Sequence, residues 1–144
     1  MEFADALKKA QDLGYAEADP SADIDGWDTC RKIVILGWLI SGKLLDYKKV
    51  PVEGISKITK ADIDAAKSEG KVVKLLGCFE KNGNEVKAYV KPVVIDKNHE
   101  LYSVNDVMNA VLLESKYLGK SMYYGAGAGK LATATAVVAD ILKC

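Results

Sequence analysis

The sequence predicts an α+β fold in which helices pack on a mixed, largely antiparallel sheet, and its 144 residues fit a single domain. Three observations support this class. Apolar residues recur at helical spacing in segments that stop at Gly14, Gly42 and Gly70. Two β-rich runs flank the turn Asn82-Gly83-Asn84, and two further short strands follow. Neighbouring strands are therefore linked by hairpins, while helices precede and follow them.

The first predicted helix covers Phe3 to Leu13, and Gly14 follows at a position where a left-handed cap costs little. Its periodicity begins at the third residue with no strand or cap before it, so we expect that the chain was cut from a longer one. Residues 17–26, EADPSADIDG, contain proline, serine, glycine and four acids. This composition predicts an ordered loop.

The best-defined predicted helix covers Asp28 to Ser41. Its second half is almost wholly apolar, so we expect that half to lie in the core. Trp27 and Trp38 are expected to anchor the helix there, although Trp27 could also form a wall of the loop at 17–26. Further along, Thr59-Lys60-Ala61-Asp62 resembles a capping box with Asp in place of Glu, and it opens a helix that ends at Gly70.

The second half of the chain contains most of the predicted strands, which cover residues 71–81, 85–95, 109–115 and 118–124. A turn near Lys116-Tyr117 separates the last two. The run Gly125-Ala126-Gly127-Ala128-Gly129 then leads into a final helix over residues 131–142. Because this run connects a strand to a helix, we expect a residue with positive φ in it.

Composition excludes several classes of protein. Twenty basic residues balance twenty acidic ones, which gives no electrostatic reason to expect nucleic acid or an anionic membrane as a partner. The longest apolar run, 33–40, is too short to cross a bilayer, and no signal segment opens the chain. Cys30, Cys78 and Cys144 are scattered and odd in number, which predicts free thiols in the cytoplasm rather than disulfides or zinc.

The densest group of ionisable residues contains five carboxylates and then two cations, at Glu17, Asp19, Asp23, Asp25, Asp28, Arg31 and Lys32. Asp28 and Lys32 are four residues apart, so they share one face of a helix. From spacing alone, an exposed ion pair worth ~0.3–0.5 kcal/mol is the favoured interpretation. Two features count against it: Lys32 directly precedes an apolar run, and the clustered acids call for a cation or a polar ligand. Calcium would be such a cation, but the segment lacks the D-x-D-x-D-G pattern with a distal Glu that an EF-hand loop needs.

The same segment closely resembles the signature of homoserine dehydrogenases. Residues 13–32 follow the pattern L-G-Y-x-E-x-D-P-x-x-D-x-x-G-x-D-x-x-R-K. The resemblance continues in order along nearly the whole chain, through VEGI at 52–55, IT at 58–59, VKLLG at 73–77, YGAGAG at 124–129, TA at 133–134 and VVAD at 137–140. It implies the substrate-binding and dimerisation domain of an NAD(P)-dependent oxidoreductase that interconverts L-aspartate 4-semialdehyde and L-homoserine. That reaction belongs to threonine, methionine and isoleucine biosynthesis.

The resemblance also implies roles for individual residues. Lys32 corresponds to the acid–base residue, and Asp28 orients it. Glu17 and Asp23 correspond to residues that hold the amino-acid substrate. The chemistry fits, because carboxylates suit an α-ammonium group and an ammonium group suits the oxygen that gains charge as an aldehyde is reduced. Asp19, Pro20, Gly26 and Arg31 match as well, and we expect them to shape the loop.

The glycine-rich run at 125–129 fits neither a Walker A loop nor a Rossmann fingerprint, because Tyr124 and Leu131 stand where Gly and Ser/Thr belong and the third glycine comes too early. A strand-to-helix turn is the favoured interpretation. The family resemblance adds that this loop reaches the dinucleotide, and Gly129 is the cofactor-binding position it implies. His99 lies in a polar turn, so we expect no metal site or catalytic triad around it.

The resemblance further implies a homodimer and a nucleotide-binding domain outside these 144 residues. We therefore expect the isolated chain to lack dehydrogenase activity. Two other functions stay open at this point. One is a non-enzymatic module for amino-acid binding or oligomerisation. The other is a phosphate-binding protein that uses the glycine-rich run.

Overall fold

The computed structural model describes residues 3–14, 16, 18–127 and 129–143. The chain forms two compact units, one made of Asp19–Ile95 and the other of Met1–Ala18 with Asp96–Cys144. The α+β class is confirmed. The expectation that residues 1–144 form one domain stays a prediction. Within the described residues, no helix is both long and apolar enough to cross a membrane.

The unit Asp19–Ile95 is organised around helix α3 (Trp27–Ser41), which confirms the best-defined predicted helix. Gly26 precedes the helix with φ 83° and Gly42 ends it with φ 70°, and both are left-handed conformations that glycine adopts without strain. The N–H of Gly42 donates to the carbonyl of Trp38 at 2.8 Å. The short elements α2 (Ser21–Ile24) and η1 (Tyr47–Lys49) lie in the loops on either side of α3 in the sequence.

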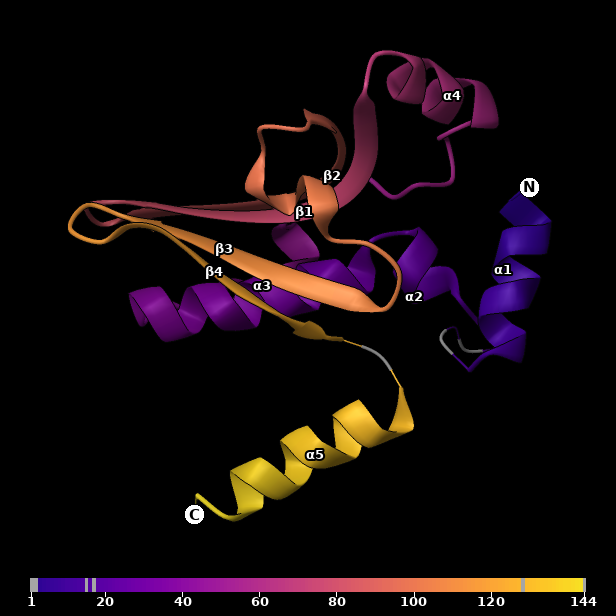
Figure 1. Cartoon of the computed structure of the whole chain (residues 1–144). Coiled ribbons are helices and arrows are strands. Elements are labelled where there is room, and N and C mark those ends of the chain that lie inside the picture. Colours follow the sequence, from indigo (N-terminus) through magenta and orange to yellow (C-terminus); the bar gives the residue numbers. More distant parts are fainter. Residues whose placement is uncertain (1–2, 15, 17, 128, 144) are drawn as a thin grey trace. The chain divides into compact units, whose positions relative to one another are not determined.

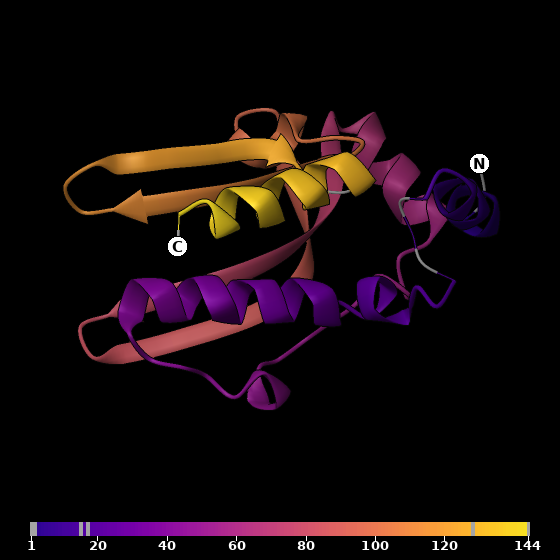
Figure 2. The same cartoon turned by 90° about the horizontal axis from the view of Figure 1, so that it is seen from below.

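Helix α3 packs along a β-hairpin made of β1 (Lys71–Asn82) and β2 (Glu85–Asp96), as Figures 1 and 2 both show. The turn contains Gly83 at φ 56°, which confirms the predicted hairpin. Gly37 lets the helix approach closely, because a Cβ there would lie 2.2 Å from Cδ2 of Phe79. Among the described residues, one hydrophobic core cluster of this unit contains Cys30, Val34, Val50, Ala88 and Val90, and Ala66 and Ile95 are buried as well.

The segment around Val52 adds an isolated bridge to β2. Val52 pairs in parallel with Val90, and the N–H of Glu53 donates to the carbonyl of Val90 at 2.8 Å. This isolated bridge is parallel, whereas the named strands among the described residues form two separate two-stranded antiparallel sheets, β1–β2 here and residues 108–115 with 119–126 in the other unit. Helix α4 (Lys60–Ser68) follows, and its capping box is confirmed: Thr59 Oγ1 accepts from the N–H of Asp62 at 3.2 Å, and Asp62 Oδ2 accepts from the N–H of Thr59 at 2.9 Å.

The other unit contains α1 (Phe3–Asp12) and the hairpin β3 (Met108–Ser115)–β4 (Gly119–Ala126). The hairpin is antiparallel, with Ser115 opposite Gly119 across the turn. The unit also contains η2 (Glu100–Ser103) and α5 (Lys130–Ile141). His99 caps η2, since its Nδ1 accepts from the N–H of Leu101 at 3.1 Å. Gly129 precedes α5 with φ 106°, which confirms a positive φ in the glycine-rich run.

Three expectations are wrong in part. The predicted loop at 17–26 contains the four-residue helix α2, in which the N–H groups of Asp23 and Ile24 both donate to the carbonyl of Pro20. The second half of α3 does not lie wholly in the core, because Trp38 is 47% exposed and Leu39 is 69% exposed. The physical reason is that the hairpin covers one face of the helix, where Cys30, Val34 and Gly37 are buried at helical spacing. Trp27 does pack against the core, whereas Trp38 does not anchor the helix as expected.

Candidate active site

The central feature of the candidate site is an ion pair on α3. The Nζ of Lys32 lies 2.7 Å from Oδ2 of Asp28, one helical turn earlier. The side chain of Lys32 is 61% exposed and that of Asp28 is 39% exposed. Asp28 also lies in the first turn of the helix, where the positive end of the helix dipole favours a carboxylate. The pair is therefore accessible to a ligand. The Asp28 carboxylate accepts from the Lys32 ammonium group and so orients the lysine side chain.

The face of α3 opposite this pair is fixed by burial. Cys30 is 0% exposed and belongs to the core cluster. Burial raises the pKa of the Cys30 thiol, so this cysteine stays protonated at neutral pH and packs as an apolar side chain. The helix turn that carries Asp28 and Lys32 is thus packed against the core through Cys30, while its polar face is exposed to solvent.

Asp23 lies in α2, just before α3 in the same unit, and its side chain is exposed. The helix that carries it is held by the segment after residue 51. The N–H of Ile55 donates to the carbonyl of Ile24 at 2.8 Å, and a Cβ on Gly54 would lie 2.3 Å from that same carbonyl oxygen. Gly54 is therefore required for this close backbone approach.

Asp19 has the shaping role that the family resemblance implies. Its Oδ1 accepts from the N–H of Ser21 at 3.1 Å. Hydrogen bonds from Ser21, first from the hydroxyl and then from the backbone, hold the pKa of Asp19 below its usual value. Asp19 is thus an ionised residue that organises the start of α2.

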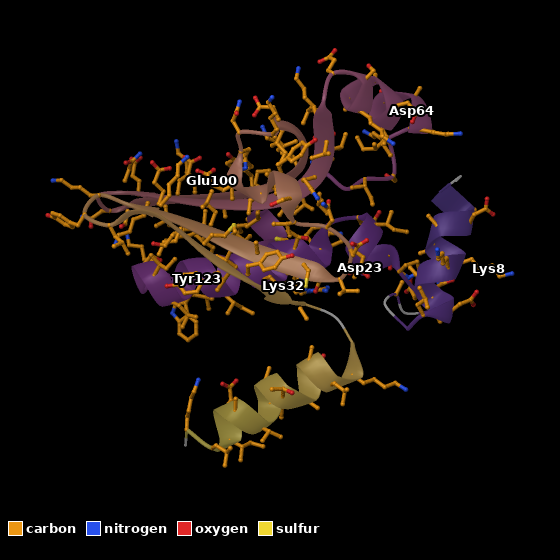
Figure 3. All side chains as sticks on the ribbon, viewed as in Figure 1. Lys8, Asp23, Lys32, Asp64, Glu100 and Tyr123 are labelled. Atoms are coloured by element: carbon orange, nitrogen blue, oxygen red, sulfur yellow. The ribbon has the colours of Figure 1, made fainter. Side chains whose placement is uncertain are left out.

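The structure brings together some of the predicted site residues. Asp28 and Lys32 are paired, and Asp23 is exposed on the neighbouring helix of the same unit (Figure 3). Among the described residues, Asp23 forms no ion pair with Lys32. Glu17 lies outside the described residues. Gly129 belongs to the other unit. A common pocket for the four polar side chains stays a prediction.

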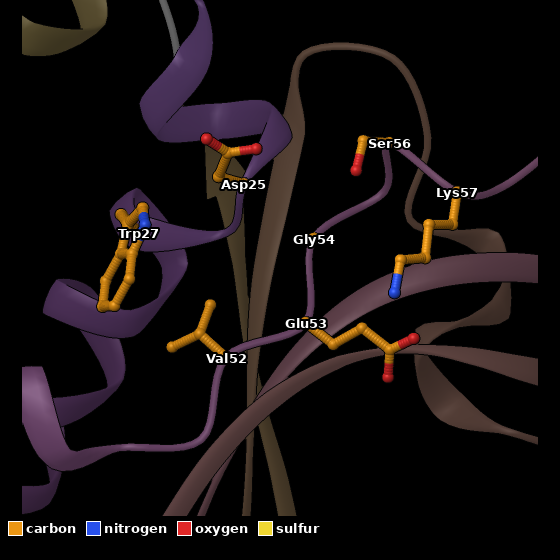
Figure 4. Close-up of a pocket in the computed structure, with 7 residues that line it drawn as sticks. All are labelled: Asp25, Trp27, Val52, Glu53, Gly54, Ser56 and Lys57. Carbon is orange, nitrogen blue, oxygen red and sulfur yellow. The ribbon is translucent and has the colours of Figure 1, made fainter.

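An open hollow of about 280 Å³ lies beside the α2–α3 junction (Figure 4). Trp27 and Val52 contribute apolar walls, and polar side chains come from Asp25, Glu53, Ser56 and Lys57. Of the predicted site residues that the structure describes, none lines it. Trp27 lies roughly 140° around the helix from Lys32, so the hollow and the ion pair occupy different faces of α3. Two sequence signals fall in this region: the VEGI motif at 52–55 and Trp27, which could wall the loop at 17–26.

Metal binding has no support in the geometry of the described residues, which contain no group of three or more His, Cys, Asp or Glu side chains able to hold an ion. Cys30 and Cys78 are both free thiols. The ion pair itself consists of an ammonium group held by a carboxylate. Such a group can donate a hydrogen bond or a proton to an oxygen that gains negative charge.

Comparison with known proteins gives one consistent result. Residues 1–142 match the family model described as homoserine dehydrogenase. The chain is 47% identical over 140 residues to the homoserine dehydrogenase of Neisseria gonorrhoeae and 41% identical over 140 residues to that of Bacillus subtilis. Each match covers 97% of this chain and 32% of the relative. The chain thus spans about a third of the length of these curated relatives.

Solved structures agree. The crystal structure of Staphylococcus aureus homoserine dehydrogenase superposes with a TM-score of 0.88 at 41% identity, covering 99% of this chain and 36% of that one. A hyperthermophilic archaeal homoserine dehydrogenase in complex with NADPH gives a TM-score of 0.78 at 31% identity, covering 99% of this chain and 40% of that one.

Proposed function

Because this chain belongs to the homoserine dehydrogenase family, we propose that it supplies the substrate-binding and proton-transferring part of an NAD(P)-dependent homoserine dehydrogenase. The substrates are L-aspartate 4-semialdehyde and L-homoserine. The observation that carries the proposal is the 2.7 Å ion pair between Lys32 and Asp28, at the positions where the family signature places the acid–base residue and its orienting carboxylate.

In this proposal Lys32 moves the proton. When bound, NAD(P)H supplies the hydride to the aldehyde carbon. As negative charge develops on the aldehyde oxygen, the Lys32 ammonium group stabilises it and transfers a proton from Nζ to it. Asp28 accepts a hydrogen bond from the ammonium group and so directs it. In the oxidising direction Lys32 starts neutral and accepts the proton, so that direction is expected to run faster at alkaline pH.

Glu17 and Asp23 are proposed to bind the substrate's α-ammonium group. Both semialdehyde and homoserine carry this group, and carboxylates bind it by charge-assisted hydrogen bonds. Support comes from Asp23, whose exposed carboxylate lies on a helix fixed by backbone contact with residues 54 and 55. Asp23 is therefore presented from rigid backbone rather than from a free loop.

Gly129 is proposed to contact the cofactor. Gly129 is the N-cap of α5 and provides no side-chain cap, so the backbone N–H groups of the first turn suit a phosphate or another polar edge of a dinucleotide. The NADPH bound by the archaeal relative fits a dinucleotide of this class. A larger residue at position 129 would also have to adopt φ 106°, which disfavours side chains.

The proposal includes a homodimer in the cytoplasm. Exposed apolar side chains on β4, at Met122, Tyr123 and Tyr124, support association with a second copy. Cys30 and Cys78 are free thiols, which fits a reducing compartment.

The test is a chimera in which this chain replaces the matched 140 residues of the N. gonorrhoeae relative. Steady-state reduction of aspartate semialdehyde by NAD(P)H would be compared for the parent chimera, Lys32→Ala and the control Lys67→Ala, an exposed lysine on α4. We expect Lys32→Ala to lower kcat by about 10²–10⁴-fold, the usual contribution of general acid catalysis, and Lys67→Ala to change it little. Near-normal turnover of the Lys32→Ala chimera would contradict the proposal.

A further inference from the structure

The Asp28–Lys32 pair has a competitor on its own helix. Arg31 is three residues from Asp28, and Lys32 is four residues from it. Both spacings bring side chains together on a helix surface. A guanidinium group binds a carboxylate through two parallel hydrogen bonds, which makes it the stronger partner of the two. Spacing alone therefore does not explain why Asp28 pairs with Lys32.

The structure holds Arg31 elsewhere. Its guanidinium carbon lies 5.8 Å from the centre of the Tyr47 ring, within the range of a cation–π contact. Among the described residues Arg31 makes no ion pair with a carboxylate. Asp28 Oδ2 is thus left to Lys32 at 2.7 Å.

Tyr47 is itself well fixed. Its ring meets that of Trp27 edge to face, with centroids 6.4 Å apart and planes at 85°. Its carbonyl accepts a weak hydrogen bond from Cys30 Sγ at 3.6 Å. The residue opens η1, whose N-cap Asp46 accepts from the N–H of Lys48 at 3.1 Å. Trp27, Cys30 and Arg31 occupy positions i, i+3 and i+4 of α3, so one residue contacts a whole face of the turn that carries the ion pair.

We propose that Tyr47 is a positioning residue: its ring retains Arg31 and so reserves the Asp28 carboxylate for Lys32. The aromatic ring, not the hydroxyl, does this. Tyr47 touches no reacting atom in this arrangement and acts only through Arg31. Its consequence for turnover rests on the proposed function, whereas its consequence for the ion pair does not.

The ion pair can be measured directly in the 144-residue chain by NMR, through the coupling across the hydrogen bond between Lys32 Nζ and the Asp28 carboxyl carbon. Tyr47→Phe keeps the ring and should leave the coupling unchanged. Tyr47→Leu frees Arg31 to compete for Asp28. The coupling between Lys32 and Asp28 should then fall by about twofold or more, because an exposed ion pair at this spacing is weak enough to be displaced by a competitor. Tyr47→Leu combined with Arg31→Ala removes the competitor and should restore it.

Two outcomes would overturn the inference: a coupling unchanged in Tyr47→Leu, or a loss that Arg31→Ala does not restore, which is what a merely structural role gives. If Tyr47→Leu does not fold, replacement of Tyr47 by pentafluorophenylalanine keeps the ring's shape but removes its attraction for cations. The same loss and the same rescue by Arg31→Ala are then expected, and an unchanged coupling overturns the inference. In the chimera, kcat should follow the coupling; if the coupling responds as expected and kcat does not, the proposed function of Lys32 fails and the role of Tyr47 stands.

Discussion

The contact between Gly54 and the α2 backbone makes a sharp prediction about stability. In Gly54→Ala, the new Cβ would lie 2.3 Å from the carbonyl oxygen of Ile24, 2.6 Å from Cα of Asp25 and 2.8 Å from its carbonyl carbon. All three atoms are backbone, so no side chain can rotate away. The backbones must separate, and this breaks the 2.8 Å hydrogen bond from the N–H of Ile55 to Ile24.

The magnitude follows from three effects. Overpacking of this kind costs about 1–3 kcal/mol. The broken backbone hydrogen bond costs about 1 kcal/mol more. Alanine also restricts the unfolded chain, which returns about 0.4–1 kcal/mol because φ at Gly54 is not positive. The net expectation is a loss of about 2 kcal/mol in the free energy of unfolding.

Urea unfolding followed by tryptophan fluorescence suits this test, because both tryptophans lie in α3. The matched control is Gly125→Ala, the same chemical change at a glycine in β4 with nothing within 4 Å of the added Cβ and no positive φ. We expect the control to remain within about 0.5 kcal/mol of the parent. Equal stabilities of Gly54→Ala and Gly125→Ala would refute the packing argument.

Three further predictions concern the same units. Gly37→Ala should lower the free energy of unfolding by about 1–2 kcal/mol despite alanine's better helix propensity, because the new Cβ meets the Phe79 ring. In urea unfolding, the double variant with Phe79→Leu should lose less than the sum of the two single changes. Thr59→Ala should destabilise the chain by about 1 kcal/mol through loss of the capping box, while Thr59→Ser should stay near the parent in thermal unfolding. The hydrogen bond from Lys120 lowers the pKa of Glu100, so the pair stabilises the fold above the carboxyl group's ordinary value of 4.5 and this contribution disappears as the pH falls through the lowered pKa. Glu100→Gln should therefore weaken the acid dependence of the melting temperature below pH 4.5, and identical pH profiles for the two proteins would exclude this linkage.

Local signals in the sequence predict most elements of the fold. Glycine at positions 26 and 42 brackets α3, Gly83 marks the β1–β2 turn, and Thr59 with Asp62 marks the start of α4. In each case the determining interaction joins residues within a few positions of each other, so it leaves a pattern that periodicity and capping rules detect.

Features set by contacts between distant segments could not be predicted in this way. The burial of α3 depends on how much of its surface a two-stranded hairpin covers, and the apolar composition around Trp38 says nothing about that. The close approach of Gly54 to Ile24 joins segments thirty residues apart and leaves no local pattern. The role of Tyr47 depends on contacts with α3 that its own neighbours in the sequence do not suggest.

In the candidate site, too, the sequence predicts the local contact but not the chemical role. Asp28 and Lys32 follow from helical spacing, and the structure confirms that they pair. Their assignment to acid–base chemistry, and that of Asp23 and Glu17 to substrate binding, came only from the family signature. A single spacing rule cannot distinguish an ordinary surface ion pair from one that handles a proton.

The most direct test of the central claim is a crystal structure of the chimera with homoserine bound. We expect Lys32 Nζ to lie within hydrogen-bonding distance of the ligand's side-chain hydroxyl oxygen, with Asp28 still paired to Lys32. The carboxylates of Glu17 and Asp23 should lie at the ligand's ammonium group. Homoserine bound in the same crystal with its hydroxyl remote from Lys32, or with its ammonium group held by other residues, would contradict it.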